Sequence, residues 1–189
     1  MKVLCVMGSP RKGGNTDSVL RWVEQDLTAA GHEVDHVDVI DYEIGGCTGC
    51  NTCKLEPDKP GCIIEDDADG LLHQMIEADL TLMATPLYCW GMTSQLKALV
   101  DRSYSLKKPL PDGTHVSLIA GKRIALLVTC AGPYEGNAEV LSTPFDRIAW
   151  WSQTEVAGTL FITGCTSPDA LPEDARDRAA RFAAEIAAQ

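Results

Sequence analysis

The sequence predicts one α/β domain over residues 1–189, built on a doubly wound, five-stranded parallel sheet with helices on both faces. Apolar runs alternate regularly with amphipathic stretches, which gives five β–α units along the chain. The predicted strands are continuous apolar runs, as expected of strands that are buried on both faces. A chain of 189 residues is long enough for one domain with a proper core and short for two. We expect the strand order 2-1-3-4-5, with the ligand site beyond the carboxyl ends of the strands.

The first unit has the sharpest boundaries. Residues 2–7 form an apolar run, which predicts a buried strand, and the run breaks abruptly into a glycine-rich segment over 8–15. An amphipathic pattern follows, so we predict a helix over 16–30 and a second strand over 33–39.

The middle of the chain predicts a second helix over 68–78, a third strand over 80–84 and a third helix over 93–103. The acidic run 65–67 directly precedes the second helix. Acidic residues are favoured at a helix cap and in the first turn, so we interpret the run as this helix start and not as a metal site.

The last two units consist of strands over 123–129 and 155–161, each followed by a predicted helix, over 143–151 and 172–188. Residues 106–122 are too many for a tight connection and contain several prolines and glycines, which predicts a surface excursion.

Charge and hydropathy exclude several classes of protein. The formal net charge of −11 argues against nucleic acid and anionic membranes as partners, because nothing in the chain neutralises phosphates in bulk. No apolar stretch approaches the roughly 18 residues of a membrane span, and the N-terminus does not have the layout of a secretory signal. We therefore expect a cytoplasmic protein.

The glycine-rich segment between the first strand and the first helix predicts an anion site. Unpaired N–H groups and the positive end of the dipole at a helix N-terminus favour a phosphate. The segment is neither a Walker A loop nor a G-x-G-x-x-G fingerprint, so a monophosphate suits it better than a triphosphate or a dinucleotide. The residues predicted to bind the phosphate are Ser9, Arg11, Gly14, Asn15 and Thr16.

The loops after the third and fourth strands should meet this segment at the carboxyl edge of the sheet. They offer aromatic rings, proline, glycine and backbone amides, which suit a flat heteroaromatic ring with a phosphate tail. FMN fits this combination better than any other common cofactor. The predicted binding residues are Pro86, Leu87, Tyr88, Cys89, Trp90 and Gly91 in one loop and Thr129, Cys130, Ala131 and Gly132 in the other.

A cysteine-rich loop over 45–67 predicts a second redox site. Cys47, Cys50, Cys53 and Cys62 follow the CxxCxxC spacing with one further cysteine, which is typical of the ligands of a 4Fe-4S cluster. Free thiols, zinc and a disulfide remain alternatives at this point. The other four cysteines are scattered, and we interpret them as small buried thiols.

Three parts of the chain carry a resemblance to a known group. They are the segment 8–11 with Asn15 and Thr16, the cysteine segment with 63–67, and the segment from 85–88 to Asp101 and Arg102. Together they resemble the NADPH-dependent FMN reductases and iron–sulfur flavoproteins of the flavodoxin-like superfamily, most strongly up to Arg102.

The resemblance implies FMN with its phosphate at the first loop, and a 4Fe-4S cluster that passes electrons one at a time. It also implies a homodimer or a homotetramer. The sequence thus predicts an FMN-dependent oxidoreductase that takes electrons from a ferredoxin-like donor and delivers them to a small-molecule acceptor.

Two alternatives remain. One is an NAD(P)H-dependent FMN or quinone reductase without a cluster, and the other is a non-enzymatic FMN-binding redox carrier. No side chain is assigned as a catalytic residue, because the chemistry would belong to the flavin.

Overall fold

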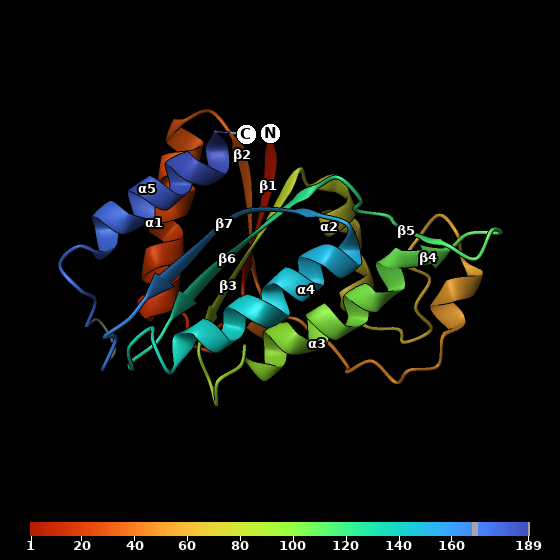
Figure 1. Ribbon diagram of the computed structural model, residues 1–189, viewed down its shortest axis with the longest axis horizontal. Coiled ribbons are helices and arrows are strands. Elements are labelled where there is room, and N and C mark those ends of the chain that lie inside the picture. Colours follow the sequence, from red (N-terminus) through yellow and green to blue (C-terminus); the bar gives the residue numbers. More distant parts are fainter. Residues whose placement is uncertain (168–169, 189) are drawn as a thin grey trace.

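The computed structural model describes residues 1–167 and 170–188, and its centre is a five-stranded parallel sheet in the order β2-β1-β3-β6-β7 (Figure 1). Counted along the main sheet, this is the predicted order 2-1-3-4-5. The strands are β1 (Lys2–Met7), β2 (Glu33–Asp38), β3 (Leu80–Pro86), β6 (Arg123–Thr129) and β7 (Glu155–Ile162). The helices are α1 (Asn15–Ala29), α2 (Ala68–Glu77), α3 (Ser94–Arg102), α4 (Ser142–Ser152) and α5 (Ala175–Ala187).

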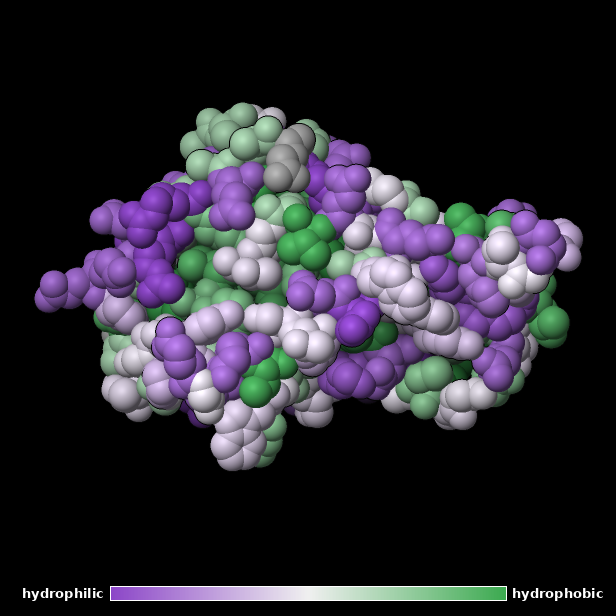
Figure 2. All heavy atoms as spheres, viewed as in Figure 1, coloured by the Kyte–Doolittle hydropathy of each residue, from purple (hydrophilic) through white to green (hydrophobic). Residues whose placement is uncertain are grey.

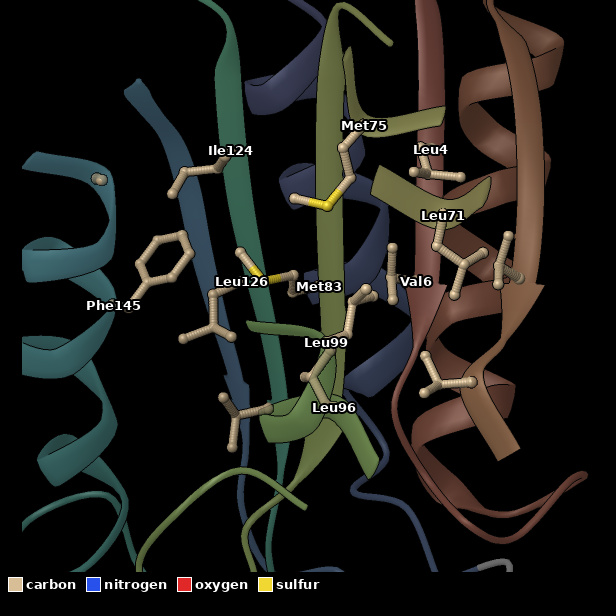
Figure 3. Packing of buried hydrophobic residues seen from close by; sticks show 14 of the residues in the cluster. Leu4, Val6, Leu71, Met75, Met83, Leu96, Leu99, Ile124, Leu126 and Phe145 are labelled. Atoms are coloured by element: carbon tan, nitrogen blue, oxygen red, sulfur yellow. The ribbon is translucent and has the colours of Figure 1, made fainter. Parts of the chain in front are cut away.

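Two hydrophobic cores lie on opposite faces of the sheet. Side chains of β1 alternate between them, with Val3 and Cys5 in the core under α1 and α5, and Leu4 and Val6 in the core under α2, α3 and α4. Figure 3 shows the second core, in which Phe145 of α4 packs towards the strands together with leucine and methionine side chains. Burial on both faces explains the continuous apolar sequence of β1. The prediction was wrong for β2, which lies at the edge of the sheet, is mostly half-buried and has four charged or polar residues among its six.

The excursion over 106–122 contains structure that the sequence did not predict. A short antiparallel pair forms there between β4 (Lys107–Pro109) and β5 (His115–Ser117). Figure 1 places this pair beside the cysteine-rich loop, at the end of the molecule away from α1 and α5. The loop itself contains one 3-10 turn, η2 (Thr52–Leu55).

The acidic run before α2 does more than start the helix. Asp66 accepts a hydrogen bond from the backbone N–H of Ala68, as expected of a helix start, but also one from Gly45. Asp67 accepts from the N–H of Glu43. These carboxylates therefore tie the beginning of the cysteine-rich loop to the start of α2.

No helix in the described ranges 1–167 and 170–188 is long and apolar enough to cross a membrane.

Candidate functional site

A cavity of about 280 Å³ opens at the carboxyl ends of the central strands. Its volume lies near the lower end of the range of roughly 300–1,000 Å³ that is usual for small-ligand sites. The loops after β1, β3, β6 and β7 converge on it, as expected at the switch point of a doubly wound sheet. The lining residues are Ser9, Arg11, Gly14, Asn15, Thr16, Pro86, Leu87, Tyr88, Thr129, Cys130, Ala131, Cys165, Thr166 and Ser167.

One end of the cavity is the N-terminus of α1. Gly14 is the N-cap of this helix, and no side chain caps the first backbone N–H groups. Gly14, Asn15 and Thr16 line the cavity, so these N–H groups are available to a ligand there. The carbonyl oxygen Oδ1 of Asn15 is buried without a hydrogen-bond partner among the described residues, while its Nδ2 donates to the carbonyl of Ser167 at 2.9 Å. A buried polar atom of this kind is usually satisfied by a ligand or water.

Hydroxyl groups reinforce this polar end. Ser9 is buried, and its Oγ accepts from the N–H of Arg11 at 3.1 Å, which closes the tight turn after β1. The Thr16 and Thr129 hydroxyls are 2.6 Å apart and join α1 to the end of β6. The arrangement combines helix N–H groups, hydroxyls and the exposed Arg11 guanidinium, so it fits a monophosphate.

Charges next to this end are already neutralised. Asp17 in the first turn of α1 is buried, accepts from the N–H of Gly13 at 2.6 Å and pairs with Arg21 at 2.9 Å. Lys12 pairs with Asp38 and Asp41. Of the two basic residues in the segment, only Arg11 lines the cavity.

The other end of the cavity has apolar and backbone walls. The N–H of Leu87 donates to the carbonyl of Thr129 at 2.9 Å, which holds the loops after β3 and β6 together. Pro86, Tyr88 and Ala131 line the space between them. A planar ring system suits walls of this composition.

The chain then turns sharply after Tyr88. Tyr88 and Gly91 exchange backbone hydrogen bonds at 2.9 Å, while Cys89 and Trp90 have φ values of 46° and 58°. The turn projects from the edge of the molecule (Figures 1 and 2), and Trp90 is 66% exposed. Cys89, Trp90 and Gly91 are therefore not among the residues that line the cavity of this single chain.

Gly132 is also absent from the lining. It packs against Asn137 so closely that a Cβ atom would lie 2.7 Å from the amide nitrogen. The remaining predicted binding residues are all brought together around the cavity.

The loop after β7 was missed by the sequence analysis. Cys165, Thr166 and Ser167 line the cavity because the N–H of Cys165 donates to the carbonyl of Cys130 at 2.9 Å. The sequence Thr-Gly-Cys-Thr-Ser after the fifth strand is polar and glycine-containing, and this signal could have identified it.

The four clustered cysteines lie in a second region, in and around the cysteine-rich loop. Cys47 and Cys50 are exposed, Cys62 is half-buried, and Cys53 is buried in η2. Within the described residues, no three or more Cys, His, Asp or Glu side chains are grouped so that they could hold a metal ion. The thiols are neighbours nonetheless, since Cys53 interacts electrostatically with both Cys50 and Cys62.

The surroundings give these thiols different proton affinities. Hydrogen bonds with Thr52 and Thr48 lower the pKa of Cys50, which favours its thiolate. Burial raises the pKa of Cys53, and this effect is only partly opposed by the charges of Lys54 and Lys108.

Cationic side chains hold the cysteine-rich loop against the rest of the fold. Arg102 is fully buried and donates to Asp66 at 2.6 Å, to the carbonyl of Gly45 at 3.0 Å and to that of Ile64 at 3.2 Å. Its Nε has no partner among the described residues. Burial lowers the pKa of Arg102, but its interactions with Asp66 and Cys62 outweigh this effect and raise it.

In donor chemistry and charge, this region therefore fits a thiolate-bound group. In geometry it is looser than a filled metal centre, because the four sulfur atoms do not converge.

Comparisons with known proteins agree with the fold and with an FMN-dependent family. Residues 1–147 match the family model described as NADPH-dependent FMN reductase. A relative named as an iron–sulfur flavoprotein of Methanocaldococcus jannaschii is 40% identical over 107 residues, which cover 57% of this chain and 54% of the relative. This chain thus spans about half the length of several curated relatives that it matches.

Solved structures share the whole fold. An FMN-dependent NADH-azoreductase of Bacillus anthracis, in complex with FMN, has a TM-score of 0.73 at 15% identity and covers 99% of this chain and 100% of its own. A flavodoxin of Streptococcus pneumoniae has a TM-score of 0.63 at 17% identity, with 100% and 99% covered. At these identities the likeness is one of fold, and it confirms the flavodoxin-like class predicted from the sequence.

Proposed function

Because this chain belongs to the NADPH-dependent FMN reductase family, we propose that it is an oxidoreductase that binds FMN and transfers electrons to a small-molecule acceptor. The observation that carries the proposal is the cavity at the carboxyl ends of the strands. Phosphate donors from 9–16 and the walls from 86–88 and 129–131 meet there.

The polar end of the cavity would hold the FMN phosphate. The N–H groups at the start of α1 and the Thr16 hydroxyl would donate to it, and Arg11 would compensate its charge. The Ser9 hydroxyl donates to the Arg11 carbonyl at 3.2 Å in this structure and would have to rotate to join them. The Asn15 side chain, held by its bond to the Ser167 carbonyl, fixes the start of the helix beside the phosphate.

The other end would hold the isoalloxazine ring. Pro86, Leu87 and Tyr88 would exclude water from one side, and the backbone of Thr129, Cys130 and Ala131 would border the other. When bound, FMN supplies both one-electron and two-electron redox chemistry. The residues of this chain position the ring and leave its edge accessible to a donor or acceptor. Cys89, Trp90 and Gly91 follow the lining residue Tyr88 in an exposed turn and would border the ring when a partner or substrate closes over it.

We extend the proposal to a 4Fe-4S cluster bound by Cys47, Cys50, Cys53 and Cys62, with a ferredoxin-like protein as electron donor. The ligand spacing supports it, as do the names of several relatives. A bound cluster supplies single-electron transfer. The dispersed thiols favour a second candidate, a cluster-free FMN or quinone reductase that takes hydride from NAD(P)H.

We further propose that the chain forms a homodimer or homotetramer. Several large aromatic side chains are exposed on the single chain, including Trp90 and Trp150 at 66% and 72%. Light scattering coupled to gel filtration measures the mass in solution, and a monomer would contradict this part of the proposal.

An absorption spectrum of protein purified without air tests the function, with flavin, iron and acid-labile sulfide counted per chain. Flavin bands with broad brown absorbance, iron and sulfide support the iron–sulfur flavoprotein. Flavin alone, with steady NAD(P)H oxidation in the presence of a quinone, supports the cluster-free reductase. Stoichiometric reduction without turnover supports a carrier. A colourless protein that stays colourless after mixing with FMN would contradict all three.

A further inference from the structure

Two of the four cysteines outside the cysteine-rich loop lie together in the wall of the cavity. Cys130 follows β6, Cys165 comes after β7, and both line the cavity. Figure 1 shows β6 and β7 side by side, as their parallel pairing requires. The other two cysteines lie apart, since Cys5 is fully buried in β1 and Cys89 is exposed. The interpretation of all four as buried thiols was therefore wrong for Cys89 and for the half-buried Cys165.

Backbone hydrogen bonds place Cys130 and Cys165 next to each other. The N–H of Cys165 donates to the carbonyl of Cys130 at 2.9 Å. The N–H of Cys130 donates to the carbonyl of Ile162 at 2.9 Å, and the thiol of Cys165 donates to the same carbonyl at 3.5 Å. Neighbouring strands joined by such bonds are about 4.7–4.9 Å apart, within the Cα separation of about 4.4–6.8 Å that a disulfide requires. The two backbones therefore lie close enough for a disulfide between their side chains.

Both thiols are free, and their hydrogen bonds are weak. The Sγ of Cys130 donates to the carbonyl of Gly132 at 3.2 Å and accepts from the Nδ2 of Asn137 at 3.9 Å. The Cys165 thiol is bonded only through its contact with the Ile162 carbonyl among the described residues. Because thiols are weak donors and weak acceptors, these contacts oppose a rotation of the side chains only slightly.

The two thiols differ in access. Cys130 is 7% exposed, whereas Cys165 is half-buried. Burial raises the pKa of both thiols, but at Cys165 a hydrogen bond from the N–H of Cys130 and the charge of Arg178 oppose this effect. Thiol–disulfide exchange depends on access and on thiolate character. Cys165 therefore suits the role of the attacking thiol, and Cys130 suits that of the second thiol.

We propose that Cys130 and Cys165 form a redox-active dithiol that reduces small-molecule disulfides and is regenerated by reduced FMN in the same cavity. The Cys165 thiolate attacks an external disulfide R–S–S–R and displaces one RS⁻, which takes up the proton that Cys165 has lost. The Cys130 thiol then loses its proton and attacks the Sγ of Cys165, so that the second RSH leaves. One disulfide is thereby reduced to two thiols, and a Cys130–Cys165 disulfide forms.

Regeneration returns the pair to its dithiol form. The Cys130–Cys165 disulfide accepts two electrons and two protons from reduced FMN, its S–S bond breaks and two S–H bonds form. This step rests on the proposed function, whereas the exchange with an external disulfide does not. The pair thus makes disulfides one class of the small-molecule acceptor.

The rival explanation is that these are two small thiols that only fill space at the ends of the strands. Packing alone predicts that an oxidant leaves the two thiols separate, while the redox role predicts one linked product. The two explanations therefore differ in a covalent bond that can be detected directly.

A peptide map tests the exchange without flavin. The full-length chain is equilibrated without air in mixtures of hydroxyethyl disulfide and its reduced thiol, the remaining thiols are alkylated, and the peptides are identified by mass spectrometry. Wild type is compared with Cys130→Ser, Cys165→Ser and Cys89→Ser, in which the last variant removes an exposed cysteine outside the pair.

We expect a Cys130–Cys165 linked peptide in wild type and in Cys89→Ser, and a mixed disulfide with the reagent at Cys165 in Cys130→Ser. Folded wild type in which the two cysteines stay unlinked at every ratio of the reagents would overturn the inference. The wild-type map decides this by itself, so a serine variant that fails to fold does not affect the result.

A second experiment tests regeneration. The oxidised chain is loaded with FMN and freed of reagent, the flavin is photoreduced without air, and its absorbance is followed in the dark. We expect the flavin to return to its oxidised spectrum as alkylatable thiols appear at Cys130 and Cys165, and to stay reduced in Cys130→Ser. Reduced flavin that persists beside an intact linked pair would overturn the regeneration step. A wild-type chain that binds no FMN would overturn the proposed function, while the peptide map still decides the exchange.

Discussion

Asn15 lies at the start of α1, where we propose that the FMN phosphate binds. Its Nδ2 is held by the Ser167 carbonyl, while its Oδ1 is buried without a partner in the described part of the chain. The side chain is therefore fixed at the start of α1, where a ligand or a water molecule can satisfy the remaining polar atom.

We predict that Asn15→Ala and Thr16→Ala each weaken FMN binding. Each removes a polar group next to the phosphate, at about 1–3 kcal/mol, which corresponds to roughly a 5- to 150-fold rise in Kd. Fluorescence titration of FMN gives the Kd, and Thr28→Ala, at an exposed position near the end of the same helix, is the control. Unchanged affinity in both variants would place the phosphate elsewhere.

His36 makes the stability of the fold depend on pH, whether or not a ligand is bound. Its Nδ1 lies 2.6 Å from Glu24, and its Nε2 lies 3.3 Å from Asp38. The hydrogen bond with Glu24 raises the pKa of His36, and burial opposes this only in part. Because the pKa of His36 is higher in the folded state than in the unfolded state, protonation of His36 stabilises the fold. This stabilisation is complete below the unfolded-state pKa of about 6.5, and it is lost as the pH rises through the folded-state pKa.

We therefore expect the free energy of unfolding of the wild type to fall by on the order of 1 kcal/mol from mildly acidic to mildly alkaline pH, because His36 loses its proton over this range. Urea unfolding of wild type, His36→Gln and His115→Gln over this range measures the effect. His36→Gln should lose this part of the slope, and the exposed His115→Gln should retain it. An identical slope in all three proteins would contradict the assignment.

At the scale of elements, the cysteine-rich loop depends on α2 and α3 for its position. The Asp66 carboxylate joins the N–H groups of Gly45 and Ala68 to the Arg102 guanidinium. Burial raises the pKa of Asp66, but the hydrogen bonds from Arg102 and the two N–H groups outweigh it and lower the pKa. The stabilisation is therefore present at neutral pH and is lost as the pH falls through the lowered value.

Asp66→Asn should destabilise the fold by about 3–5 kcal/mol, because it leaves the Arg102 charge buried and unpaired. Asp101→Asn is the matched control: it breaks the exposed Lys97–Asp101 pair and should cost less than about 1 kcal/mol. Urea unfolding at neutral pH compares the two. Equal losses would show that the buried pair contributes no more than the exposed one.

The turn at 88–91 stores strain, because two residues other than glycine have positive φ there. We predict that Cys89→Asn with Trp90→Gly raises stability by roughly 1 kcal/mol, since these residues tolerate left-handed backbone. Thermal unfolding measures the change, and the exposed Trp150→Gly in α4 should instead destabilise. A lower melting temperature for the turn variant would mean that the Trp90 side chain supports the fold.

The sequence predicted those elements whose signal is local. The central strands β1, β3 and β6 have nearly continuous apolar runs, the edge strand β2 has a mixed apolar and polar sequence, and each helix has an amphipathic pattern, so their order and approximate bounds followed. The strands β4 and β5 are three residues long and contain lysine, proline and histidine, so no periodicity could indicate them. The polar, glycine-containing sequence after β7 indicates a loop at the same edge of the sheet, but how closely Thr166 and Ser167 approach α1 depends on tertiary contacts such as the bond from Asn15 to the Ser167 carbonyl.

At the scale of the whole molecule, the two candidate sites occupy separate regions. The cavity lies at the carboxyl edge of the sheet, while Figure 1 shows the cysteine-rich loop with β4 and β5 at the end away from α1 and α5. The order of the strands determines where the first site lies, whereas the position of the second depends on the contacts of the cysteine-rich loop with α2 and α3. Most of the lining of the cavity could therefore be predicted from the sequence, except for the loop after β7, whereas the arrangement of the four thiols could not.

The central claim is that the loop after β1 binds the phosphate of FMN, and a comparison of FMN with riboflavin tests it most directly. The two ligands differ only in the phosphate, so their Kd values for the same wild-type protein, measured by flavin fluorescence, isolate its contribution. We predict that riboflavin binds at least about 100-fold more weakly, since charge-assisted hydrogen bonds to the phosphate are worth roughly 1.5–3 kcal/mol each. Equal affinities for the two flavins would contradict the account.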